Sequence, residues 1–233
     1  RRQWADQVAA AASLGHPALR RVTVAVEGNG PDDRAIRAVL LSLGCQVEDR
    51  WRPGIPAFRA SHGGFCLTAQ DERGAILDSS QLLALVALIE MENGSGRLAV
   101  PSGASAAVDL VAAGYDGTVL RLDRDGKPAR DLYAAQPWFW SAPSAAARIC
   151  ARMGVSGQKL DALISKTPRF SSWRREVPLS SDRGRVMEAM VREQGRTCGG
   201  EGLRVHTGGG WVYLVPLARR SALRVVGEGP DLE

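Results

Sequence analysis

Two adjacent arginines, Arg219 and Arg220, are the residues of this 233-residue chain best suited to attract an anion. They lie between two short apolar runs that are typical of strands, so we expect them in an exposed loop. The planar, permanently charged guanidinium group suits phosphate and carboxylate ligands. The alternative is that both side chains are only solvated.

Histidines and cysteines, which could act as metal ligands or nucleophiles, lack the spacing of such sites. His62 is interpreted as a loop residue and His206 as a solvent-facing strand residue. The widely spaced cysteines form no CxxC pair, so we expect reduced thiols and a cytoplasmic protein. These cysteines are Cys45, Cys66, Cys150 and Cys198.

Two further segments have a possible binding role. Gly28-Asn29-Gly30 lacks the third glycine of a dinucleotide-binding fingerprint, so we interpret it as a turn. The run Trp138-Phe139-Trp140 is expected to pack at a domain interface, or else to offer a stacking platform to a sugar or a partner.

The net charge of +5 comes from arginines that are scattered along the chain. Because no basic run with interleaved aromatic residues occurs, we do not expect nucleic-acid binding. The longest apolar segment, Gln81–Met91, is shorter than the roughly 20 residues of a membrane span, so no membrane association is expected. Arg1 opens the chain without a signal-peptide pattern. The absence of an initiator Met suggests a fragment or a trimmed chain.

Strand and helix signals alternate over most of the chain and predict α/β layers. In the first layer we expect a helix capped by Asp32 or Asp33 and an irregular segment over Glu48–Ala60. In the second we expect a buried helix over Gln81–Glu92, parallel strands on either side of a helix, and a loop-rich segment over Asp123–Pro143. From Trp173 onward the pattern predicts a small β-α-β-β-β unit.

Three segments, in order, resemble the α-D-phosphohexomutases, the phosphoglucomutase and phosphomannomutase family. Glu201–Glu228 is similar to the family pattern G-W-x-L-V-R-P-S-G-T-E-P-x-x-R-V-x-x-E, and Asp71–Glu90 to D-E-x-G-x-x-L-x-x-D-x-L-L-A-L. Arg174–Met190 resembles the start of the family's fourth domain. The residues in register with the first pattern are Gly210, Trp211, Leu214, Pro216, Arg224, Val225 and Glu228.

The resemblance implies a fold of two phosphohexomutase-type α/β layers with mixed sheets, followed by a small α+β (β-α-β-β-β) domain. It places a truncated second-domain-like layer at residues 1–75, a third-domain-like layer at 76–172 and a fourth-domain-like unit at 173–233. The match is closest to the mutase-like half of fused mannose-1-phosphate guanylyltransferase/phosphomannomutase proteins.

Family members move a phosphoryl group between an enzyme serine and a sugar, with Mg²⁺ held by a D-x-D-G-D-R loop. Counting back from Asp71 places this loop where no carboxylate stands, so we expect no metal ion and no cofactor. The positions are Ser61, His62, Gly63, Gly64 and Phe65. The family's phosphate loop is also altered, which leaves Arg219, Arg220 and Arg224 as a degenerate phosphate site.

These departures predict a catalytically degenerate phosphohexomutase-like module. We expect it to act as a structural, oligomerising or regulatory partner in sugar-phosphate and sugar-nucleotide metabolism. A sugar-nucleotidyltransferase domain or chain, or a second copy of the chain, is the expected partner, with weak sugar-phosphate binding. The alternative is an active phosphomannomutase or phosphoglucomutase that missing N-terminal sequence or another chain completes.

Overall fold

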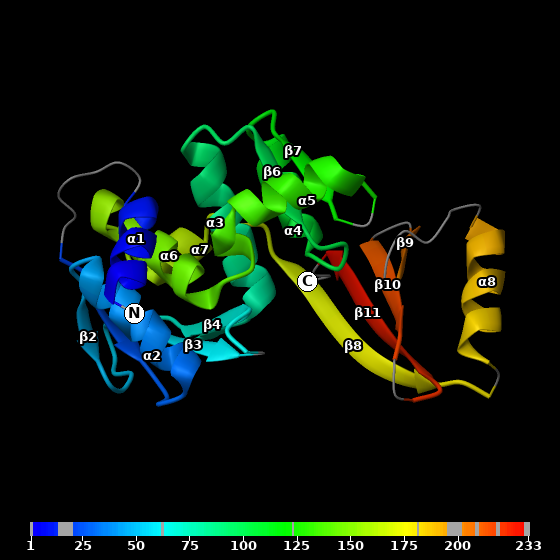
Figure 1. The fold of residues 1–233 in the computed structure, drawn as a ribbon, viewed down its shortest axis with the longest axis horizontal. Coiled ribbons are helices and arrows are strands. Elements are labelled where there is room, and N and C mark those ends of the chain that lie inside the picture. The colour runs from blue at the N-terminus through cyan, green and yellow to red at the C-terminus, as the bar shows by residue number, and fades with distance from the viewer. Residues whose placement is uncertain are drawn as a thin grey trace.

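The structure is a computed structural model in which helices pack with several β-sheets (Figure 1). It describes residues 2–13, 21–61, 63–122, 124–180, 182–194, 202–207, 210–217 and 220–230. The predicted fold class, α/β layers followed by an α+β unit, is confirmed. His62, Cys198 and Arg219 lie outside the described residues.

A mixed five-stranded sheet with the order β2-β1-β3-β4-β5 forms the first layer. Strand β1 runs parallel to β2 and β3, whereas β3, β4 and β5 pair antiparallel. The strands are β1 (Thr23–Val26), β2 (Gln46–Glu48), β3 (Ala57–Ser61), β4 (Cys66–Gln70) and β5 (Ile76–Leu77). Helices α1 (Arg2–Ala12), α2 (Pro31–Ser42) and α6 (Ala142–Ser156) pack against one another beside this sheet.

Helix α3 (Ser79–Glu92) is the buried helix that the sequence predicts. The Asp78 carboxylate accepts hydrogen bonds from the backbone N–H groups of Ser80 and Gln81, which satisfies donors that the first helical turn leaves unpaired. Helix α3 packs on α4 (Ala106–Ala113), α6 and α7 (Leu160–Ile164), so the apolar side chains that nearly surround it find partners.

Strands β6 (Arg97–Val100) and β7 (Thr118–Arg121) form a parallel pair, as predicted. One hydrophobic core contains Val24 of β1, Leu85 of α3 and Ile149 of α6. This core crosses residue 75, where we place the first domain boundary, and the boundary itself stays a prediction.

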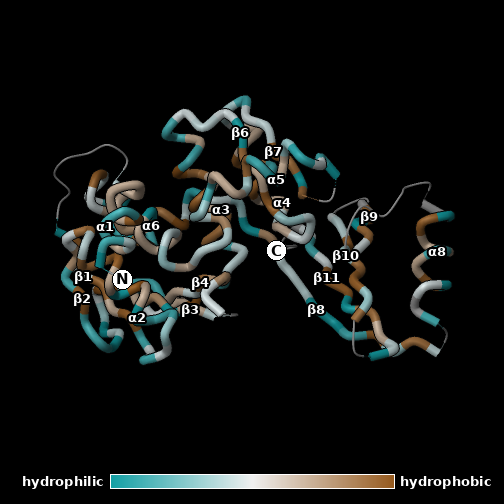
Figure 2. Tube along the Cα trace, viewed as in Figure 1, coloured by the Kyte–Doolittle hydropathy of each residue, from teal (hydrophilic) through white to brown (hydrophobic). Residues whose placement is uncertain are grey.

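The last part of the chain forms a four-stranded antiparallel sheet with the order β8-β11-β10-β9. Its elements are β8 (Phe170–Pro178), α8 (Arg183–Gln194), β9 (Leu203–Thr207), β10 (Gly210–Pro216) and β11 (Ala222–Pro230). Figure 2 shows hydrophilic residues in the middle of β8, where Arg174, Arg175 and Glu176 follow one another and are exposed.

Two predictions of irregular structure are wrong. Ala57–Ser61, within the segment expected to be irregular, forms strand β3, because Ala57 and Phe58 are buried and pair with β1 and β4. The segment expected to be loop-rich contains helix α5 (Gly126–Ala135) and a single 3₁₀ turn, η1 (Pro137–Phe139). Helix α5 buries only Ala129 among its residues, so it contributes little to the core.

Candidate functional site: an apolar cavity beside the β3–β4 turn

The loop predicted to match the family's metal loop is the tight turn between β3 and β4. Gly63 and Gly64 both have positive φ, 67° and 82°, a conformation that favours glycine. The carbonyl oxygen of Gly64 accepts a 2.8 Å hydrogen bond from the backbone N–H of Ala142, which ties the turn to the start of α6. Phe65 ends the turn with its side chain 65% exposed.

A carboxylate that the counting from Asp71 missed lies beside this turn. A Cβ atom on Gly64 would stand 3.1 Å from Oδ1 of Asp32, in the first turn of α2. The neighbouring Asp33 has a different role, because its carboxylate accepts from the backbone N–H groups of Gly30 and Ala60. The N-cap of α2 is Gly30, so the prediction that Asp32 or Asp33 caps this helix is wrong: both lie in its first turn, where Asp33 completes a capping box. Asp32 is the acidic group closest to Gly64.

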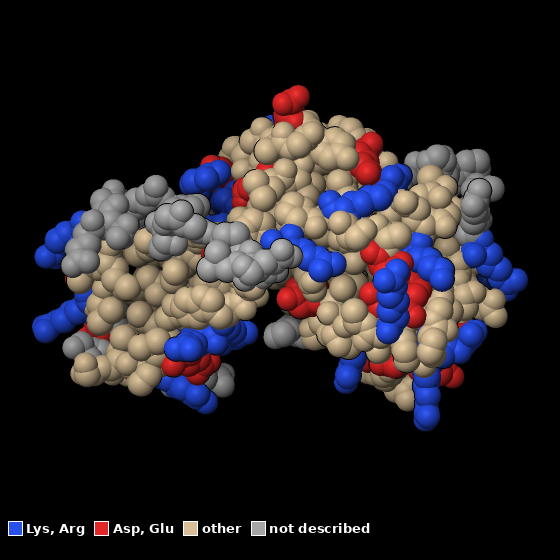
Figure 3. Space-filling view, turned by 180° about the vertical axis from the view of Figure 1, so that it is seen from behind, with Lys and Arg blue, Asp and Glu red and all other residues tan. Residues whose placement is uncertain are grey.

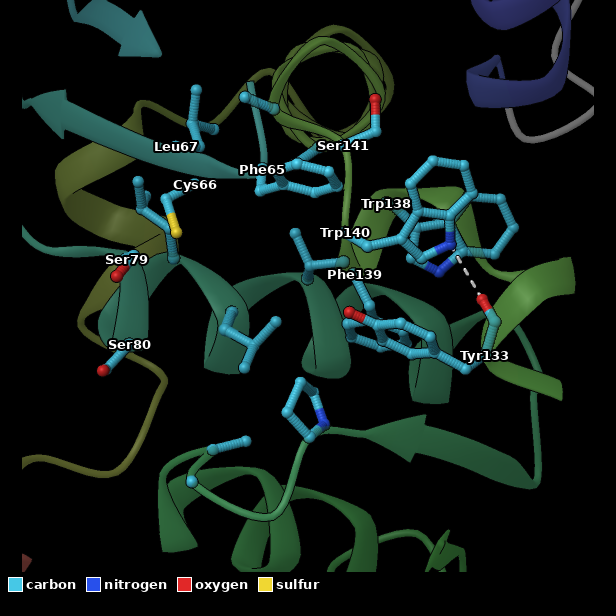
Figure 4. Close-up of a pocket in the computed structure, with 18 residues that line it drawn as sticks. Phe65, Cys66, Leu67, Ser79, Ser80, Tyr133, Trp138, Phe139, Trp140 and Ser141 are labelled. Carbon is cyan, nitrogen blue, oxygen red and sulfur yellow. Dashed lines mark hydrogen bonds between the residues drawn. The ribbon is translucent and has the colours of Figure 1, made fainter. Parts of the chain in front are cut away.

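Phe65 stands at the edge of a cavity of about 350 Å³ (Figure 4). Leu82, Leu83 and Val86 of α3 line one side of it, and the aromatic run 138–140 lines another. Pro101, Gly103 and Ala104, from the connection after β6, also line it. The structure thus joins Phe65 to Trp138, Phe139 and Trp140, although more than 70 positions separate them in the sequence.

The polar groups of the cavity wall are neutral. Nε1 of Trp140 donates a 2.9 Å hydrogen bond to the carbonyl oxygen of Tyr133, which holds the indole in place (Figure 4). Burial raises the pKa of the Tyr133 phenol, so it stays protonated at neutral pH. Among the lining residues that the structure describes, none carries a charge.

The positively charged side chain that lies behind the aromatic residues of the cavity already has interaction partners. The guanidinium of Arg148 stacks on Trp138, 4.0 Å from the ring centroid, and Nε lies 2.7 Å from Oε1 of Glu90. Arg148 also donates to the backbone carbonyl oxygens of Ala11 and Ala12 at the end of α1. Its charge therefore stabilises the packing of α1, α3 and α6 and does not face the cavity as a free anion-binding group.

The two predicted phosphate-site arginines that the structure describes, Arg220 and Arg224, do not line this cavity. Arg220 and Arg224 lie near the carboxylate of Glu176 on β8, at 3.5 and 3.7 Å. The β10–β11 connection that carries Arg220 lies at the end of the sheet away from α4 (Figure 1). On the face shown in Figure 3, Lys and Arg side chains are spread over the surface and interspersed with acidic ones.

The remaining residues that the sequence singled out are the cysteines, His206 and the segment Gly28–Gly30. Cys45, Cys66 and Cys150 are free thiols. A hydrogen bond between the thiols of Cys45 and Cys150 lowers the pKa of Cys45 and raises that of Cys150, which is wholly buried. The backbone of His206 pairs with that of Trp211, and the prediction that its side chain faces solvent is not tested. Asn29 and the flanking glycines lie in the loop between β1 and α2, with a bend at Gly30.

A polar junction that the sequence did not reveal adjoins the cavity at residues 101–105. Glu228 of β11 accepts a 2.6 Å hydrogen bond from the Ser105 hydroxyl and a 3.1 Å bond from the backbone N–H of Ala106. Arg204 and Arg121 donate to the carbonyl oxygen of Ala104 from two sides. The only sequence signal was Glu228 in register with the family pattern.

Comparison with known proteins shows what this chain is similar to. No protein-family profile matches the chain. A probable phosphoglucosamine mutase from Methanosarcina barkeri is 25% identical over 187 residues, which is 71% of this chain and 42% of that protein. The chain is a phosphohexomutase homologue. It spans about two fifths of this relative's length.

Solved structures agree on the fold of this phosphohexomutase homologue. A phosphoglucomutase/phosphomannomutase family protein from Burkholderia thailandensis superposes with a TM-score of 0.70 at 15% identity, over 97% of this chain and 60% of that chain. The N-acetylphosphoglucosamine mutase of Aspergillus fumigatus superposes with a TM-score of 0.65 at 10% identity, over 98% of this chain and 62% of that chain.

The expectation that no cofactor is involved must be corrected. The Aspergillus fumigatus mutase was solved in complex with GlcNAc-6P and magnesium, which contradicts that expectation. Our count considered only positions 61–65 and overlooked Asp32, whose carboxylate α2 brings to the same turn. Asp32 alone is not the set of carboxylates that the family loop supplies, and the described residues contain no group of three His, Cys, Asp or Glu that could hold a metal ion. We therefore derive no chemical step through a metal.

Among the helices that the structure describes, none has both the length and the apolar content needed to cross a membrane.

Proposed function

We propose that this chain is a phosphohexomutase-like module without mutase turnover of its own, which serves as a structural, oligomerising or regulatory partner in cytoplasmic sugar-phosphate metabolism. The observation that carries the proposal is the cavity beside the β3–β4 turn, whose described lining residues include no charged side chain. In the phosphohexomutases that the chain resembles, the corresponding loop holds the Mg²⁺ ion that neutralises charge during phosphoryl transfer.

The physical argument concerns the charge of the transition state. Phosphoryl transfer spreads negative charge over the phosphate oxygens, and catalysis depends on donors and cations already aimed at that charge. Here the turn presents the phenyl ring of Phe65, and the cation behind the wall, Arg148, is paired with Glu90. These surroundings favour the binding of a ligand over phosphoryl transfer.

The proposed partner is a sugar-nucleotidyltransferase, as a fused domain or a separate chain, or a second copy of this chain. The support is the sequence resemblance to fused guanylyltransferase/phosphomannomutase proteins. Arg220 and Arg224 provide at most weak affinity for a sugar phosphate, because both lie near Glu176, whose negative charge opposes an anion.

A coupled enzyme assay tests the central claim. The purified chain is supplied with mannose, glucose or glucosamine 1-phosphate, Mg²⁺ and a hexose bisphosphate activator, and formation of the 6-phosphate is followed. We expect a rate equal to that of the reagents alone, while a phosphoglucosamine mutase in a parallel sample turns over. A rate that stays with the chain through a second purification would refute the proposal and support the active-mutase alternative.

A further inference from the structure

The cavity beside Phe65 has the dimensions of a small-molecule site. Its volume of about 350 Å³ lies at the lower end of the roughly 300–1,000 Å³ typical of ligand pockets. Four separate parts of the chain line it: residues 65–67 at the start of β4, helix α3, the connection after β6, and the segment from Tyr133 to Ala145. Because these parts pack in one core, the cavity is largely preformed.

The lining is suited to a flat apolar ring. Trp138, Phe139 and Trp140 present aromatic surface, and Leu82, Leu83 and Val86 of α3 present aliphatic surface (Figure 4). Stacked aromatic pairs are favourable beyond the burial of their area. A ligand with a flat apolar ring would gain from stacking on the aromatic side chains and from burial of its apolar area.

The same lining disfavours an anion. Moving a charged phosphate out of water without a compensating cation costs far more than hydrogen bonds to hydroxyl groups return. The polar side chains that line the cavity are the hydroxyls of Ser79, Ser80, Ser141 and Tyr133 and the thiol of Cys66. None of these supplies positive charge.

A hydrogen-bond donor is available in the wall. The hydroxyl of Tyr133, which stays protonated, points into the cavity (Figure 4). Nε1 of Trp138 also has no acceptor among the described residues, but it is fully buried and a ligand in the cavity does not reach it. A ligand oxygen can accept a hydrogen bond from the Tyr133 hydroxyl.

We propose that the cavity binds a neutral small molecule that presents a flat apolar ring and a hydrogen-bond acceptor, in place of a sugar phosphate. This inference rests on the proposed function, since a ligand of this kind would regulate or anchor a module that does not turn over phosphosugars. Phe65 covers one edge of the ligand in the bound state.

Prodan, a neutral naphthyl ketone whose emission shifts to shorter wavelength in apolar surroundings, is a suitable probe. It is titrated into the whole chain, and the shift is followed with and without excess mannose 1-phosphate. We expect saturation at one prodan per chain and no displacement by the sugar phosphate. Failure of the emission to shift, or displacement by mannose 1-phosphate, would overturn the proposal.

Three variants locate the site. Phe65→Ala removes one aromatic edge and should weaken prodan binding about three- to tenfold. Leu83→Trp fills the cavity from α3 and should abolish saturable binding. Tyr115→Ala, a matched truncation of an exposed aromatic residue outside the lining, should leave the affinity unchanged. Equal affinities in all four proteins would show that prodan binds elsewhere and would overturn the proposal.

The two proposals fail in different ways. Turnover in the coupled assay refutes the proposed function whatever prodan does. Absence of prodan binding in an inactive chain refutes only the ligand class.

Discussion

The cavity beside Phe65 and the junction around residues 101–105 are neighbours that use polar chemistry in opposite ways. They share the connection after β6, since Gly103 and Ala104 line the cavity while Ala104 and Ser105 hold the junction. The junction contains the buried charges of Arg121 and Glu228. The cavity has no charged side chain among its described lining residues.

The difference lies in whether each charge has a partner within the fold. Glu228 accepts from Ser105 and from the first backbone N–H of α4, where the helix dipole also favours negative charge. Arg121 donates to two backbone carbonyl groups and pairs with Asp109. Charge is therefore present where it joins segments of the chain, and it is missing from the cavity where a phosphosugar would need it.

The largest effect is expected from removing the cation behind the aromatic wall. Arg148→Met leaves the buried carboxylate of Glu90 without its ion-pair partner, so unfolding free energy should fall by about 3–5 kcal/mol. Urea unfolding measures the change. Arg152→Met is the matched control one turn along α6, because the Arg152–Glu92 pair is partly exposed and should contribute only about 0–1 kcal/mol.

The Arg148 variant should also show a defined pH dependence. Burial already raises the pKa of Glu90 against the opposing effect of Arg148, and loss of the arginine raises this pKa further. A raised folded-state pKa means that stability is fully present below the unfolded-state pKa of about 4.3 and is lost as pH rises through the folded-state value. The penalty should thus be smaller at about pH 5 than at about pH 8. An equal penalty at both values would show that packing, and not the unpaired carboxylate, carries the effect.

The second effect tests the junction itself. Glu228→Ala removes a 6% exposed carboxylate and leaves the Ser105 hydroxyl and the Ala106 N–H without their acceptor, so we expect a loss of about 2–3 kcal/mol. Glu176→Ala, in the adjacent strand β8, removes a carboxylate whose side chain is 43% exposed and should cost about 0–1 kcal/mol. Similar losses in the two variants would remove the distinction between joining charges and surface charges.

Local sequence signals predicted the elements whose determining residues lie close together in the sequence. The apolar run of α3 and the parallel strands β6 and β7 on either side of α4 were both recognised from residues a few positions apart. Helix α5 was missed because it has little buried surface, and β3 because its neighbours in the sheet, not its own sequence, define it.

The site was less predictable, because it depends on contacts between distant segments. The sequence singled out the aromatic run and Phe65 separately, but only the fold places them around one cavity. In the same way, counting along the chain could not bring Asp32 of α2 to Gly64, or Glu228 to Ser105. Alignment with the family pattern tells which residue types occupy one loop. It does not tell which residues of other helices and strands surround that loop.

A smaller effect is expected at the helix that lines the cavity. Asp78→Ala removes the N-terminal cap of α3, which should lower the unfolding free energy by about 1 kcal/mol. Asp78→Ser retains a side-chain acceptor and should recover most of that loss. If both variants lose stability equally, the carboxylate acts through its charge near the helix dipole and not through its hydrogen bonds.

The smallest change in stability is expected at Phe65, although this residue is central to the proposed ligand site. Because its side chain is 65% exposed, Phe65→Ala should alter the unfolding free energy by no more than about 0.5 kcal/mol. Phe58, in the preceding strand, is 0% exposed, and Phe58→Ala should cost about 3–5 kcal/mol. The contrast separates a phenylalanine that holds the fold from one that the fold does not need. A large loss for Phe65→Ala would mean that its ring already packs as core, and the edge of the cavity would then have a structural explanation without any ligand.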